Sequence, residues 1–97
     1  MNEFLLLMHA DALRLETGEA WATYFAKLRA EGRFEGGSSI GPGESLRKEG
    51  LPGNVHTVLS GYIKVLAHDL EDAKRLVRGN PVFEAGGTVE VRALPRS

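Results

Sequence analysis

The sequence TVLSGYIKVLA, residues 57–67, is the longest strand candidate of this chain, and the other predicted elements are placed relative to it. It is rich in Val, Leu, Ile and Tyr, residue types that favour a β-strand. A helix is predicted to follow directly, with Asp69 as its N-cap and Asp72 at the capping-box position. Gly79 and the Asn80-Pro81 pair predict its end. Its apolar face would consist of Leu70, Ala73, Leu76 and Val77.

Two further strands are predicted before this unit. Residues 3–9 form a continuous apolar run, which is typical of a strand buried on both faces. Residues 34–40 predict a second strand, in which Gly36 and Gly37 favour a bulge or a close approach to another group.

A helix is predicted between these two strands. Thr17 is its expected N-cap, Glu19 places negative charge in its first turn, and Gly32 lies just past its end. Its apolar stripe follows the i, i+3, i+4, i+7 pattern of a core-facing helix. The stripe consists of Trp21, Tyr24, Phe25 and Leu28, and we expect Trp21 in the core.

A last strand is predicted over residues 88–94, after a short connection over residues 82–87. The order of elements is then β-α-β-β-α-β, which is the order of a ferredoxin-like fold. Both crossovers would place their helices on the same face of one four-stranded antiparallel sheet, so the predicted class is α+β. A chain of 97 residues has room for one such domain, residues 1–97.

The composition excludes several classes of function. The formal net charge of −1 gives no electrostatic basis for binding nucleic acid or an anionic membrane. The chain has no cysteine, and its three histidines share no metal-ligand spacing, so we expect neither a metal nor a cofactor. No apolar run is long enough to span a bilayer, and the N-terminus lacks the positive charge of a signal peptide. We therefore expect a soluble cytoplasmic protein.

The face of the sheet that carries no helix is predicted to be apolar. The strand at 3–9 and much of the strand at 57–67 have apolar residues at both odd and even positions. At about 25 cal/mol per Å², leaving several such side chains in water would cost several kcal/mol. A second copy of the chain is the expected cover, in a closed homodimer. The alternative is that the long loop at 41–54 folds back over this face.

Four segments resemble the C-terminal half of YCII-related proteins of the DGPF type. These are residues 61–65 (GYIKV), 69–73 (DLEDA), 80–81 (NP) and 86–92 (GGTVEVR). The N-terminal half is similar more loosely, and residues 49–52 (EGLP) partly match the segment that names the family. The resemblance implies a dimeric α/β barrel of ferredoxin-like subunits, as in small, often uncharacterised bacterial proteins. It also implies that Glu49 contributes to ligand binding.

Strand alternation places four polar side chains on the helix-free face. If the valines of the last strand face the helices, the residues that alternate with them face the cleft between two subunits. The same holds for the residues that alternate with Ile63 and Val65 in the strand at 57–67. The residues placed in this cleft are Tyr62, Lys64, Glu90 and Arg92. Such a cleft could hold a small anionic or phenolic ligand by charge-assisted hydrogen bonds. The alternative for Glu90 and Arg92 is an ion pair at the interface.

Two histidines are candidates for a general base. His56 lies at the end of the long loop, and loop ends often line pockets. His9 ends the first strand, two residues before Asp11. With a histidine as base and Tyr62 or Arg92 stabilising an oxyanion, the protein would be a cofactor-free lyase, isomerase or monooxygenase-like enzyme. The first hypothesis is instead a homodimer that binds a small molecule without turnover, and a third is a purely structural dimer.

Overall fold

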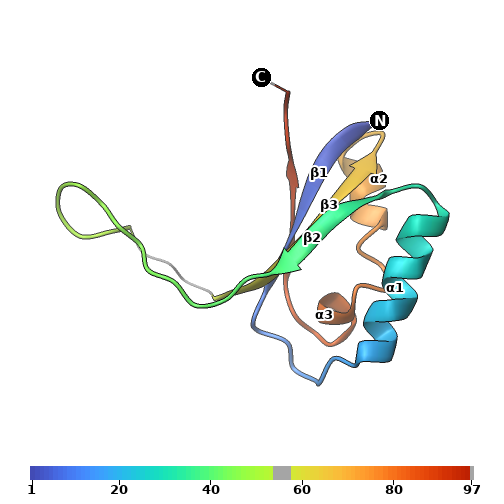
Figure 1. The fold of residues 1–97 in the computed structure, drawn as a ribbon, viewed down its shortest axis with the longest axis horizontal. Helices are drawn as coiled ribbons and strands as arrows, with labels where there is room; N and C mark the ends of the chain where they lie inside the picture. The colour runs from blue at the N-terminus through green and yellow to red at the C-terminus, as the bar shows by residue number, and fades with distance from the viewer. Residues whose placement is uncertain (54–57, 97) are drawn as a thin grey trace.

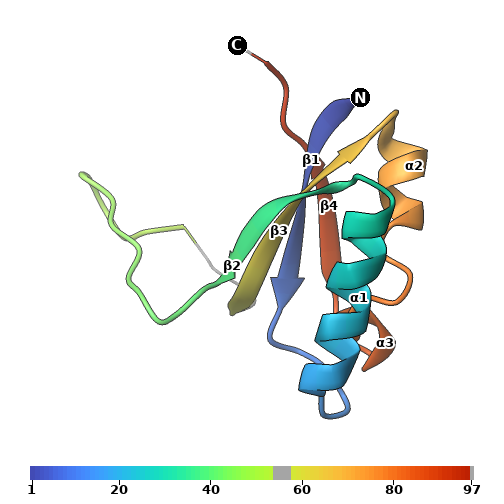
Figure 2. The same cartoon turned by 45° about the vertical axis from the view of Figure 1, so that its right-hand side comes forward.

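The computed structural model describes residues 1–53 and 58–96. Its elements are β1 (Asn2–His9), α1 (Gly18–Ala30), β2 (Phe34–Ser39), β3 (Leu59–Ala67), α2 (Leu70–Arg75), α3 (Pro81–Glu84) and β4 (Val89–Ala93). The strands form one antiparallel sheet in the order β2-β3-β1-β4. The helices all lie on one face of this sheet, as Figures 1 and 2 show. The predicted α+β class and ferredoxin-like arrangement are therefore confirmed.

The core lies between the helices and one face of the sheet. Alternate residues of β1 and β3 point into it because a strand has a two-residue side-chain period. The buried side chains of these two strands are Phe4, Leu6, Met8, Ile63, Val65 and Ala67. Tyr24 and Leu28 of α1 pack against them. The residues of β1 at positions 3, 5 and 7 are half-buried, so in the single chain this strand is fully buried on one face only.

Both ends of α1 are capped by the residues that the sequence indicated. At the N-terminus, the Thr17 hydroxyl oxygen accepts a hydrogen bond from the Ala20 N–H at 3.0 Å. At the C-terminus, the N–H groups of Gly32 and Arg33 donate to carbonyl oxygens of the last turn, as in a Schellman motif. Gly32 has a φ of +69°, which a residue with a side chain rarely adopts. These caps fix the limits of α1 and direct the chain into β2.

The second helix is shorter than predicted. Asp69 caps α2 as expected, since its carboxylate accepts a hydrogen bond from the Asp72 N–H at 2.8 Å. However, α2 ends at Arg75, four residues before Gly79. Leu70, predicted on the apolar face, is 48% exposed. Only the later part of the predicted apolar face, from Ala73 onward, is buried in the core.

A third helix, α3, lies where the sequence predicted a simple connection. Asn80 and Pro81 were expected to mark a stop, but they begin this helix. The Asn80 side-chain oxygen accepts hydrogen bonds from the N–H groups of Val82 and Phe83 at 3.0 and 3.2 Å. Proline fits the first helical position because no N–H is needed there. The Asn-Pro pair is thus a helix start as well as the end of the preceding turn.

The segment between β2 and β3 projects from the body of the molecule. Residues 41–53 are all exposed and belong to no helix or strand. Figures 1 and 2 show this segment as an arm that leads away from the sheet. Its two leucines, Leu46 and Leu51, are 91% and 86% exposed. Residues 41–53 therefore do not form the cover that the loop alternative required for the helix-free face.

Candidate functional site

A cavity of about 480 Å³ opens between α1 and the β2–β3 half of the sheet. Trp21 and Phe25 line it from α1, and Met8 and Phe34 line it from the strands. Its volume lies in the range of about 300–1,000 Å³ that is typical of small-molecule sites. The cavity is on the helix side of the sheet, whereas the sequence placed the ligand on the opposite face.

Part of the floor of this cavity is backbone, at Gly37 and Gly61. Gly37 lies opposite Ile63 in the ladder between β2 and β3. A Cβ atom on Gly37 would collide with the carbonyl oxygen of Tyr62, so this position requires glycine. A Cβ atom on Gly61 would lie 3.0 Å from the Ser38 carbonyl oxygen. The ladder is also irregular between residues 34 and 37, which confirms the bulge and the close approach predicted for this strand.

The walls of the cavity are aromatic. The rings of Trp21 and Phe25 are stacked, with their centroids 5.4 Å apart. Phe34 meets Phe25 edge to face, at a centroid distance of 5.3 Å. The Trp21 indole N–H donates a hydrogen bond to Oε1 of Glu16 at 3.0 Å, which holds this carboxylate at the cavity. Aromatic rings arranged in this way can bind an apolar or aromatic ligand that carries one polar group.

The sequence interpretation missed this site. Trp21 is half-buried at the edge of the core, where it lines the cavity. Glu16 and Ser39 also line the cavity, and neither was a candidate. The sequence did contain one indication of the cavity: residues 36–39 (GGSS) have small side chains, whereas the helix stripe is aromatic. Small side chains leave a space between a helix and a strand only where the two face each other, and the sequence does not show that they do.

The helix-free face carries the four polar residues that strand alternation placed there. Leu7 lies between Tyr62 on β3 and Glu90 on β4 in the strand register. Leu5 lies between Lys64 and Arg92 in the same way. Their arrangement on one face thus follows the expected geometry, and their part in ligand binding remains a prediction. Tyr62 also borders the cavity on the other face of the sheet. Because side chains alternate along a strand, its main chain lies on that side and its ring does not.

The charged residues of the helix-free face form ion pairs. The Lys64 ammonium lies 2.9 Å from Oε2 of Glu3, and this contact lowers the pKa of the Glu3 carboxyl. The Arg92 guanidinium lies 3.0 Å from Oε2 of Glu90 within the same strand. The predicted pairing of Glu90 with Arg92 thus occurs inside one chain.

His9 has a different partner from the one that the sequence suggested. Its Nε2 lies 2.6 Å from Oε1 of Glu90, and the residue is only 8% exposed. The hydrogen bond from His9, followed by that from Arg92, holds the pKa of the Glu90 carboxyl below its usual value. Asp11, two residues from His9, instead accepts hydrogen bonds from the N–H and hydroxyl groups of Thr88. His9, Glu90 and Arg92 therefore form one connected polar array on the helix-free face.

The remaining predicted residues do not join this array within the described chain. His56 lies outside the described residues. Glu49 is exposed and belongs to the projecting arm, away from the sheet. His68 is exposed and immediately precedes the N-cap of α2, as predicted.

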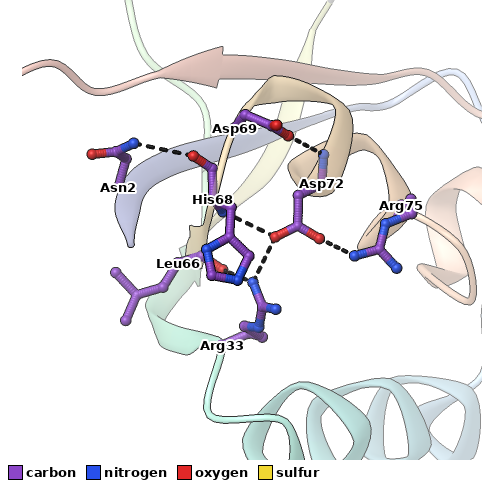
Figure 3. Close-up of polar contacts among 7 residues, drawn as sticks. All are labelled: Asn2, Arg33, Leu66, His68, Asp69, Asp72 and Arg75. Carbon is purple, nitrogen blue, oxygen red and sulfur yellow. Dashed lines mark hydrogen bonds and ion pairs between the residues drawn. The ribbon is translucent and has the colours of Figure 1, made fainter.

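A second polar cluster surrounds the buried carboxylate of Asp72 (Figure 3). Its Oδ2 accepts hydrogen bonds from the His68 N–H at 2.9 Å and from the Arg33 guanidinium at 2.8 Å. Its Oδ1 pairs with Arg75. The His68 N–H, and next Arg33, hold the pKa of the Asp72 carboxyl well below its usual range. Each carboxylate oxygen is satisfied by groups of the fold, so this cluster is a structural tie between α2 and the strands.

The sequence matches no protein-family model and no curated protein. No helix in the described part of the chain has the length and apolar character needed to cross a membrane. Among residues 1–53 and 58–96, no three His, Asp or Glu side chains come together as a metal site. The functional interpretation therefore depends on the geometry of the cavity and of the polar array.

Proposed function

We propose that this protein binds a small, largely apolar molecule in the cavity between α1 and the sheet. The observation that carries the proposal is a space of about 480 Å³ with aromatic walls, opposite the glycine and serine residues at the end of β2. Aromatic walls with a few polar groups are typical of ligand sites in proteins. The proposal keeps the small-molecule function expected from the sequence and moves its site to the helix side of the sheet.

The test uses two neighbouring serines that point to opposite faces of β2. Ser39 lies opposite Gly61, with its side chain on the cavity side. Ser38 also borders the cavity, but it lies opposite Tyr62, so its side chain points to the helix-free side and only its main chain faces the cavity. We expect Ser39→Ile to fill the cavity and to abolish binding, and Ser38→Ile to preserve it. Both variants place isoleucine, a good strand former, in the same strand, so they control for general effects on β2.

The measurement is a thermal-shift screen with small neutral, cationic and anionic aromatic compounds. A compound that binds only the native state raises the apparent unfolding midpoint. Trp21 is the only tryptophan of the chain, so quenching of its fluorescence reports binding at the cavity directly. A set of compounds that bind wild type and the Ser39→Ile variant equally well would contradict the cavity as the site.

We propose in addition that the chain forms a homodimer through its helix-free face. The support is the row of half-buried leucines on that face, including Leu5 and Leu7 at its centre. Pairing of two such faces would remove these side chains from water. The β-α-β-β-α-β order agrees with the architecture implied by the resemblance to YCII-related proteins, and we propose membership of that family on the same residues.

A second candidate function is cofactor-free catalysis of a proton transfer, with His9 as the base. The observation that favours it is the 2.6 Å contact between His9 Nε2 and Glu90, because a carboxylate partner orients an imidazole. The other ring nitrogen, Nδ1, is buried without a partner among the described residues, so catalysis would require a movement that exposes it. The array lies on the helix-free face, where a second subunit would enclose it. Tyr62 lies on the same face, one strand away across Leu7.

This candidate predicts exchange of acidic C–H protons with solvent. Small ketones and phenols would be incubated with the protein in D₂O, and deuterium incorporation would be followed by NMR. We expect exchange to be lost in His9→Gln and retained in His68→Gln, since His68 is exposed and remote from the array. Equal exchange in both variants, or none in wild type, would count against catalysis by His9.

A further inference from the structure

The charge of the cavity lining is one-sided. Among the described residues that line the cavity, Glu16 is the only one charged at neutral pH, and neither lysine, arginine nor histidine is present. Of the other polar residues in the lining, Ser39 directs its hydroxyl to the cavity side, and strand alternation leaves Ser38, Ser60 and Tyr62 with their main chains there. A carboxylate ligand would meet the like charge of Glu16 there, whereas a cationic ligand would meet an opposite charge.

The Glu16 carboxylate is held in place and has one oxygen to spare. Its Oε1 accepts the indole N–H of Trp21, whereas its Oε2 has no partner within the described part of the chain. Arg14, the nearest cation in the sequence, is directed elsewhere and donates to the Glu84 carbonyl oxygen at 2.8 Å. The free oxygen thus lies near the edge of the Trp21 indole that carries the N–H, where it can accept a charge-assisted hydrogen bond from an ammonium group.

The aromatic rings at the other end of the cavity already contact a cation. The Arg29 guanidinium lies over Phe34, 4.9 Å from the ring centroid. Arg29 follows Trp21 by eight residues, which is about 12 Å along a helix. A cation of the chain therefore already lies near Phe25 and Phe34, whereas among the described residues no arginine or lysine pairs with Glu16.

We infer that the cavity binds an amine: an apolar, preferably aromatic body lying against Phe25 and Phe34, with its ammonium group at the free Oε2 of Glu16. This inference rests on the proposed function of the cavity and names its ligand class. The Glu16 carboxylate would attract a cation by its charge and would accept a charge-assisted hydrogen bond from an ammonium N–H. The predicted ligand thus differs in charge from the anionic or phenolic molecule expected at the helix-free face.

The test is a fluorescence titration of Trp21 with four compounds that share one ring. These are benzylamine, benzyltrimethylammonium, benzyl alcohol and benzoate. We expect the two cations to bind roughly tenfold or more tightly than benzyl alcohol, and benzoate to bind most weakly. In Glu16→Gln, the affinity for the cations should fall roughly tenfold, and the affinity for benzyl alcohol should remain unchanged.

Two controls make the result specific. Glutamine keeps a side-chain carbonyl oxygen that can accept the Trp21 N–H, so Glu16→Gln removes the charge without removing the contact. Glu19→Gln removes an exposed charge from the first turn of α1, outside the cavity, and should change no affinity. Circular dichroism of both variants checks that the fold is kept.

The outcomes separate the inference from the proposed function. Equal binding of benzylamine and benzyl alcohol, tightest binding of benzoate, or an unchanged cation affinity in Glu16→Gln would overturn the amine while leaving a ligand cavity in place. Binding of the cations that Ser39→Ile does not weaken would overturn the location. Failure of all four compounds to bind would overturn the amine inference, and failure of the wider screen would overturn the proposed function too.

Discussion

The hydroxyl group of Tyr24 is buried between α1 and the turn after α2. It donates a hydrogen bond to the Leu76 carbonyl oxygen at 2.6 Å, and burial raises the pKa of Tyr24 to about 12. An unfolded tyrosine titrates near pH 10. Between about pH 10 and pH 12 the native state therefore keeps a proton that the unfolded chain has lost.

The free energy of unfolding should consequently fall as the pH rises from about 10 towards about 12. A shift of this size corresponds to about 3 kcal/mol over the whole window. We expect Tyr24→Phe to lose this alkaline decline, and to be about 1–2 kcal/mol less stable at neutral pH because the Leu76 carbonyl oxygen loses its partner. Denaturant unfolding at several pH values measures both effects. Tyr62→Phe is the control, and it should keep the wild-type alkaline slope.

The Asp72 carboxylate is expected to make the free energy of unfolding depend on pH in the acid range. Its pKa is depressed in the native state, so its contribution to stability is fully present above the unfolded pKa, about 3.9. As the pH falls below about 4, the unfolded chain takes up a proton that the native carboxylate does not, and the contribution is lost. Asp72→Asn should lower the unfolding temperature at neutral pH by several degrees and flatten the acid decline.

Glu71→Gln is the matched control for this experiment. Glu71 is the neighbouring carboxylate of α2, and its side chain is 79% exposed in a pair with Lys74. Exposed pairs of this kind contribute little to stability, so the variant should behave as wild type in both the acid and the neutral range. If Asp72→Asn loses stability at acid pH as wild type does, other carboxylates are responsible for that loss.

At the scale of elements, the glycines at the two ends of α1 are expected to respond differently to the same substitution. Gly32→Ala forces a side chain into a φ of +69° and should cost about 1 kcal/mol of unfolding free energy. Gly18→Ala places the methyl group in open space at the first helical position. It should be neutral or stabilising because alanine has the higher helix propensity. Chemical denaturation of the two variants compares them, and equal destabilisation would contradict the assignment of Gly32 as the cap.

The elements whose signals are local were predictable. Thr17 and Gly32 delimit α1 because capping depends on residues within one turn. The Asn80-Pro81 pair was misinterpreted because the same dipeptide can end one helix and begin the next. The exposure of Leu70 was also unpredictable, since α2 has only six residues and buries only Asp72 and Ala73.

The whole molecule measures 19 Å along its shortest axis, which corresponds to one sheet and one layer of helices. One face of the sheet is consequently open, and Leu7 lies near its centre, between Tyr62 and Glu90. We expect Leu7→Lys to convert the proposed dimer to a monomer, because two buried ammonium groups would meet at the interface. Light scattering coupled to gel filtration measures the change.

Leu70→Lys is the control for this prediction. Leu70 is a partly exposed leucine on α2, in the helix layer, so the same change there should leave the dimer intact. A wild-type protein that is monomeric at micromolar concentration would contradict the dimer. The ligand cavity would be unaffected by that result, since it lies within one chain on the other side of the sheet.

Periodicity, caps and turns specified the strands, most of α1 and the division of side chains between two faces, since each depends on neighbours within a few residues. Side-chain partners were decided by packing: His9 meets Glu90 across 81 positions of the chain, and Arg33 meets Asp72 across 39. No local pattern encodes such pairs, because they depend on strand register and on how a helix sits over the sheet. The cavity arose in the same way. Aromatic residues of α1 and a glycine-rich strand enclose a space only once the fold has set them opposite each other.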